Sequence, residues 1–189
     1  TPKDPTIPIM IRKIEQARRY VLRVKLCTVM AAKNSELPSL WDQIDLPDKR
    51  PGEKGWGQKV SAMWTWKNQL PADYPDEIFY GKIKGGYAAL IAMPYLRETH
   101  FPEAYRPVES LPDLAQVIFA KVRSEPRETT ELRRELMDEQ GCTKSQFDTA
   151  LKNLQITMNV VRSNDADLEC DTWLPFGELY PEIWATRPT

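Results

Sequence analysis

The spacing of apolar residues in the second half of the chain predicts three consecutive helices. Apolar positions recur every three to four residues over Leu114–Val122 and, after a break at Pro126, over Glu131–Met137. A third helix is predicted over Ser145–Leu154, where the apolar side chains fall on one stripe.

Two sequence signals mark where these helices begin. Ser110 stands three residues before Asp113, with a proline between them, which predicts that the serine side chain caps the first helix. Thr143 and Gln146 have the spacing of a capping box, so the third helix is expected to begin directly after Thr143.

Beyond the third helix the pattern changes from helical to alternating. Ile156, Met158 and Val160 alternate with polar residues, which predicts a strand that starts at Ile156. Turn residues over Ser163–Asp165 and renewed alternation over Leu168–Thr172 predict a return strand. A helix that runs into a two-stranded ribbon is typical of a winged helix, which binds duplex nucleic acid or packs on another protein.

The first half of the chain shows the same order of elements. Pro71 and Pro75 are expected to end its long helix, and Gly85 and Gly86 supply the positive φ angles of a hairpin turn. The predicted elements are helices over Ile11–Lys25, Ser39–Ile44 and Gly57–Leu70 and strands over 78–83 and 87–92.

These patterns predict an α+β protein with tandem winged-helix-like units, each a helix-turn-helix followed by a β-hairpin wing. The predicted division is an N-terminal unit over 1–92, a connector over 93–110, a C-terminal unit over 111–178 and a tail over 179–189.

Composition narrows the classes of function. The net charge of −1 gives no global attraction to nucleic acid, so any binding must come from a local patch. The three cysteines are widely spaced, which disfavours a disulfide framework or a zinc cluster. With no apolar run of membrane length and no signal peptide in the sequence, we expect a cytoplasmic protein without membrane contact, metal or cofactor.

Basic residues are concentrated in the first predicted helix, where Glu15 is the only acid. Arg18, Arg19 and Arg23 are the predicted phosphate contacts, and the alternative is a solvated helix face. The full basic set is Arg12, Lys13, Arg18, Arg19, Arg23 and Lys25.

The third helix of the second unit offers side chains for a DNA groove. Lys144, Gln146 and Lys152 are the predicted groove contacts, and Arg162 is the basic residue of the wing. The wing is otherwise acidic, which would repel phosphates and favours the alternative that this unit packs on a protein. Its acids are Asp165, Asp167, Glu169 and Asp171.

The first half is rich in aromatic residues, for which we expect a core role, with stacking on unpaired bases as the alternative. This set is Trp41, Trp56, Trp64, Trp66, Tyr80 and Tyr87. The single histidine, His100, has no second histidine to act with and is expected to be structural.

Gln43 and Asp45 place an amide and a carboxylate two residues apart, a pair that can orient and deprotonate a water molecule.

Four segments resemble the AlkZ-related proteins, small bacterial relatives of the AlkZ and YcaQ DNA glycosylases. The segments are Glu15–Val24, Pro51–Gly57, Tyr74–Ile83 and Thr143–Leu151. The resemblance implies tandem winged helices and a Gln-x-Asp pair for hydrolysis of the bond to an alkylated base, at Gln43 and Asp45 here. The chain is about half the length of those enzymes.

The leading hypothesis from sequence is therefore a winged-helix protein that binds duplex DNA without retained catalysis. The alternatives are a DNA glycosylase that uses Gln43 and Asp45 on alkylated bases, and a protein–protein interaction module.

Overall fold

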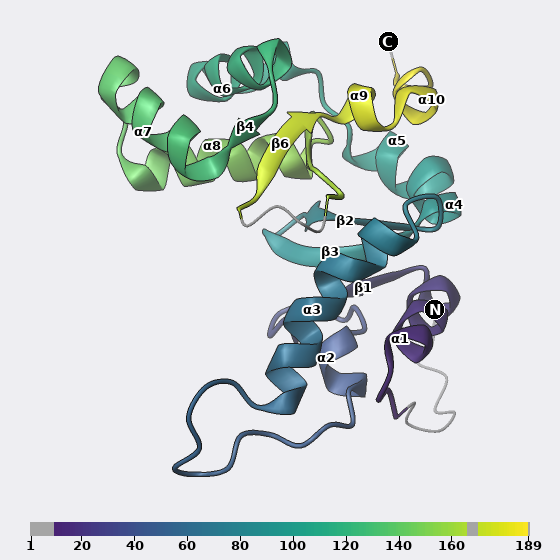
Figure 1. Ribbon diagram of the computed structural model, residues 1–189. Coiled ribbons are helices and arrows are strands. Elements are labelled where there is room, and N and C mark those ends of the chain that lie inside the picture. Colours follow the sequence, from purple (N-terminus) through teal and green to yellow (C-terminus); the bar gives the residue numbers. More distant parts are fainter. Residues whose placement is uncertain (1–9, 166–169, 189) are drawn as a thin grey trace.

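Two three-stranded antiparallel sheets and the helices around them form the fold in the computed structural model, which describes residues 10–165 and 170–188 (Figure 1). The strands of the first sheet lie in the order β1-β3-β2. The elements of this half are α1 (Ile14–Val24), β1 (Leu26–Thr28), α2 (Leu40–Gln43), α3 (Gln58–Asp73), β2 (Ile78–Ile83) and β3 (Tyr87–Ala92).

The second half repeats both the order of elements and the order of strands. Its sheet runs β4-β6-β5, so the last strand of each half lies between the other two. The elements are α6 (Asp113–Ser124), β4 (Arg127–Glu128), α7 (Thr129–Gln140), α8 (Lys144–Ile156), β5 (Val160–Arg162) and β6 (Thr172–Pro175). The mixed α+β composition predicted from sequence is confirmed.

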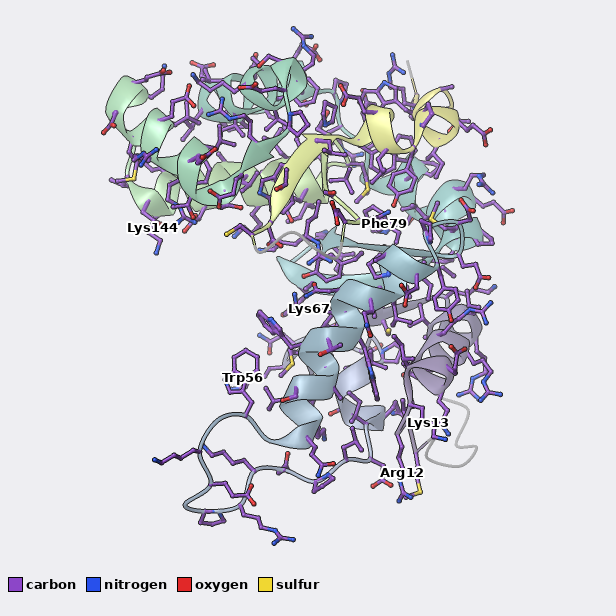
Figure 2. The ribbon with its side chains drawn as sticks, viewed as in Figure 1. Arg12, Lys13, Trp56, Lys67, Phe79 and Lys144 are labelled. Atoms are coloured by element: carbon purple, nitrogen blue, oxygen red, sulfur yellow. The ribbon has the colours of Figure 1, made fainter. Side chains whose placement is uncertain are left out.

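The segment between the halves and the C-terminal segment pack into one shared core. Phe101 stacks on Phe176 with ring centroids 5.0 Å apart, and Phe79 of β2 meets Tyr180 at 5.7 Å. Figure 2 places Phe79 where the first sheet meets the upper half of the molecule. The elements concerned are α4 (Met93–Tyr95), a π-helix (Leu96–His100), α5 (Phe101–Ala104), a 3-10 turn (Val108–Ser110), α9 (Phe176–Leu179) and α10 (Pro181–Trp184).

Two local predictions agree with the structure in detail. The hairpin pairs Ile78 with Ala92 through to Ile83 with Tyr87, and both turn glycines have positive φ. The capping box of α8 is formed, because Gln146 N donates to Thr143 Oγ1 at 3.2 Å and Thr143 N donates to Gln146 Oε1 at 2.8 Å.

The predicted cap of the second half's first helix is wrong. Ser110 ends the 3-10 turn, and its hydroxyl donates to the carbonyl of Pro107 at 2.6 Å. The helix α6 begins at Asp113, with no side-chain cap.

The strand predicted from Ile156 is also wrong at its start. Ile156 is the last residue of α8, and Met158 turns the chain with a φ of 58°. Asn159 holds this turn, because its backbone N–H donates to Leu154 at 2.9 Å and its side-chain amide donates to the carbonyl of Arg106, also at 2.9 Å. The alternating pattern crosses a turn, and the strand β5 begins only at Val160.

The N-terminal helices differ from the prediction at their ends. Ile11 lies outside α1 and forms a parallel bridge with Ile44. Helix α3 continues past Pro71 to Asp73. Because proline has no N–H, the carbonyl of Lys67 cannot form its helical bond, and it instead accepts from Arg162 Nη2 at 3.5 Å. Part of the predicted return strand, from Leu168, lies outside the described residues.

Candidate nucleic-acid interface

The three arginines predicted to contact phosphate have different surroundings on α1. Arg18 binds the carboxylate of Glu77 through Nε and Nη2, at 2.7 and 2.6 Å, and lies over the ring of Tyr74. This hydrogen bonding lowers the pKa of Glu77. Arg19 and Arg23 are exposed and form no ion pair with a described residue, so they are the ones available to an anion.

The predicted groove residues of α8 do not share one exposed face. Lys144 is exposed in the first turn, whereas the amide oxygen of Gln146 is engaged in the capping box. Lys152 is half-buried on the hairpin of the first half, with its Cδ 3.1 Å from where a Cβ on Gly86 would lie. The C-terminal part of α8 thus packs on β2 and its turn, and the exposed side chains of the helix lie between Lys144 and Thr149.

Arg162 is buried between the two halves. Its guanidinium lies 3.9 Å from the ring centroid of Tyr80, and Nη1 donates to Asn68 Oδ1 at 2.8 Å. Asp171 of the wing lies 3.6 Å from the same group. The carboxylate of Asp171 therefore partly neutralises the buried guanidinium of Arg162. The predicted contact of Arg162 with nucleic acid stays a prediction. Two further acids of the wing, Asp167 and Glu169, lie outside the described residues.

Gln43 and Asp45 flank Ile44 at the end of α2. The backbone fixes both residues, because Ile11 N donates to Gln43 O at 2.8 Å and Asp45 N donates to Ile11 O at 2.9 Å. The carboxylate of Asp45 is bound by Arg12, whose Nε and Nη2 lie 2.7 and 2.5 Å from Oδ2. Neither residue lines the two pockets described below.

Two tryptophans expected in the core are on the surface instead. Trp56 is 64% exposed and Trp64 is 54% exposed, and their rings meet edge to face at 5.7 Å. Helical spacing shows which residues share a face, but it does not show whether another element covers that face. Trp66, on the opposite side of α3, is buried as expected.

The segment before α3 adds positive charge to these exposed rings. Lys49, Arg50 and Lys54 are all exposed there and outnumber the exposed acids Asp48 and Glu53, and no described residue forms an ion pair with the three cations. In Figure 2, Trp56, Lys67 and Lys144 lie along one edge of the molecule, whereas Arg12 and Lys13 lie on the other side. Helix α1 and helix α8 also lie on opposite sides of the molecule in this view (Figure 1).

A pocket of about 550 Å³ lies between the halves, next to Trp64. Its walls come from the segment after β1, from α3, from the β2–β3 hairpin and from the described parts of the wing. Lys67 and Arg162 both line it and are both buried. Burial, and then the charge of Arg162, lowers the pKa of Lys67.

A second pocket of about 610 Å³ is open and lies between α6 and α8. Gln146, Thr149 and Asn153 line its α8 side, so these polar positions face α6 rather than a shared outer surface. Neither pocket could be predicted from the sequence, because each is lined by segments far apart in the chain.

Within residues 10–165 and 170–188, no group of three or more histidine, cysteine or acidic side chains is placed to hold a metal ion. None of the helices described there is long and apolar enough to cross a membrane. Burial lowers the pKa of His100, whose Nε2 is buried and has no hydrogen-bond partner among the residues that the structure describes.

The fold and this surface define a mixed α+β protein in which one order of helices and strands occurs twice. A family model described as AlkZ related matches residues 11–168, well over half of the chain. The chain belongs to the AlkZ-related family, which relates it to DNA glycosylases. No curated protein and no solved structure matches it.

Proposed function

We propose that this protein binds duplex DNA through two winged-helix units, over 1–92 and 111–178, and does not excise bases. The repeated order of elements, together with the same central position of the last strand in each sheet, supports the assignment of both units. The family's relation to DNA glycosylases supports DNA as the partner.

The observation that carries the proposal is the exposed aromatic and basic surface beside α3. In a winged helix the third helix is the one held against the duplex, and α3 is the third helix of the first unit. Trp56 and Trp64 are exposed there, next to the cations of residues 49–54. On α8, the third helix of the second unit, Lys144 adds a cation along the same edge (Figure 2).

The experiment compares this surface with the basic face of α1. Fluorescence anisotropy at low salt measures the affinity for a labelled duplex. We expect Lys49→Glu with Lys54→Glu to weaken binding, and to lower the slope of log affinity against log salt by about 0.9 for each phosphate that the protein no longer neutralises. The matched control is Arg19→Glu with Arg23→Glu, which makes the same change in charge on α1.

A larger loss of affinity in the α1 variant than in the Lys49 and Lys54 variant would show that α1 forms the interface, as predicted from the sequence. Absence of binding to duplex, nicked and single-stranded DNA would reject the proposal and leave a protein-docking module as the function to test.

A further inference from the structure

Lys67 is a buried lysine that forms no direct ion pair with a described carboxylate, and Asp171 acts on it only at longer range. The residue is 8% exposed, and its ammonium group has one protein acceptor in that part of the chain, Asn68 Oδ1 at 3.2 Å. Its remaining contacts are with ring faces, at 4.1 Å from the centroid of Trp64 and 5.4 Å from that of Tyr80. A buried ammonium with two unused donors is costly unless an anion completes its surroundings.

A second buried cation stands beside the first. Arg162 lies on the ring of Tyr80 and shares the acceptor Asn68 with Lys67. The only ion pair of Arg162 with a described residue is the long contact to Asp171, whose side chain is 55% exposed. The residues that line the pocket carry three cationic side chains, Lys67, Lys82 and Arg162, and two carboxylates, Asp165 and Asp171. The excess of positive charge, with two of the cations buried, favours a bound anion.

The same pocket also has an exposed apolar surface on which a flat group could stack. Trp64 lines the pocket and is more than half exposed, and Met30 beside it is 52% exposed. Aromatic rings at a basic groove bind nucleic-acid bases by stacking, with little dependence on which base is present. The volume of about 550 Å³ is within the range of pockets that hold small ligands.

We propose that the pocket between the halves binds one nucleotide, with its phosphate at Lys67 and Arg162 and its base stacked at Trp64. This site is separate from Gln43 and Asp45, which do not line it.

The inference rests partly on the proposed function, because the nucleotide comes either from solution or from an unpaired position in a DNA strand. Anisotropy with a fully paired duplex and with the same duplex carrying one bulged nucleotide tests the second source. Calorimetric titration with deoxynucleoside monophosphates tests the first.

We expect the bulged duplex to bind on the order of tenfold more tightly than the paired duplex, the gain that one stacked base provides. Trp64→Ala and Lys67→Met should each remove this preference. Met137→Ala is the control, because Met137 is an exposed apolar residue on α7 that does not line the pocket. Unfolding curves for each variant establish that it is folded.

The outcomes separate the two proposals. Equal affinity for paired and bulged duplex, with no binding of monophosphates, overturns the nucleotide site and leaves duplex binding intact. Binding of monophosphates that Lys67→Met abolishes, without binding to any duplex, supports the site and overturns the proposed function. Failure of every ligand to bind overturns both.

Discussion

The guanidinium of Arg162 lies 3.9 Å from the ring centroid of Tyr80, and this contact joins the two halves of the molecule. The strand β5 supplies the arginine and β2 supplies the tyrosine. The same guanidinium donates to the carbonyl of Lys67, which Pro71 leaves without its helical partner. A proline in the last turn of one helix thus creates an acceptor for a side chain about ninety residues further along the chain.

Replacing Arg162 with methionine is expected to destabilise the protein by about 3 kcal/mol. The change removes a buried cation–ring contact, leaves the carbonyl of Lys67 without a donor and removes one of the two donors to Asn68 Oδ1. Urea unfolding measures the change in stability. Arg19→Met, at an exposed position, is the control and should stay within about 0.5 kcal/mol of the parent. Equal stability of the two variants would contradict a structural role for Arg162.

Lys67 should make the stability depend on pH in the alkaline range. Burial lowers its pKa below the ordinary 10.5, so between the lowered value and 10.5 the unfolded chain binds more protons than the folded one. The free energy of unfolding therefore rises with pH in that window. Lys67→Met removes the effect, and urea midpoints of parent and variant across this range measure it. Parallel pH profiles would show that the lysine is solvated.

The parent protein is expected to release no alkylated base from DNA, because the carboxylate of Asp45 is already bound by Arg12. Mass spectrometry of the bases released from DNA alkylated at guanine N7 measures this. Base release by the parent that Asp45→Asn abolishes and Asp48→Asn preserves would instead establish a glycosylase. Asp45→Asn should cost less than about 1 kcal/mol of stability, since the ion pair is partly exposed.

Cys27 should resist alkylation until the protein unfolds. Burial raises the pKa of its thiol to about 12, so at neutral pH it holds roughly a thousandfold less thiolate than an ordinary cysteine. Cys170 is exposed and should react first. Iodoacetamide labelling followed by mass spectrometry gives the two rates with and without denaturant. Comparable rates in the native protein would mean that the buried cluster around Cys27 opens readily.

The elements that sequence analysis placed correctly are those held by contacts within a few residues. The hairpin over 78–92 depends on two glycines in its own turn, and the capping box of α8 depends on Thr143 and Gln146. The strands β1 and β4 were not predicted, because each is very short and is defined by its pairing with the last strand of its own sheet.

The candidate site was only partly predictable for the same reason. The sequence indicated that Trp64, Lys67 and Arg162 carry rings and charge, but the tryptophan was expected inside and the arginine outside. Whether a side chain is buried depends on which distant element covers it, and β5 meets α3 and β2 only in the folded chain.

The sequence by itself therefore determined the order of the long helices and the position of the β2–β3 hairpin, because periodicity, caps and turn residues act locally along the chain, and four matching segments indicated the family. Tertiary structure alone decided that the two halves share a core, that two tryptophans remain exposed and that two cations are buried beside one pocket. Those features arise from packing between segments about a hundred residues apart, where long-range burial and charge compensation set the free energy.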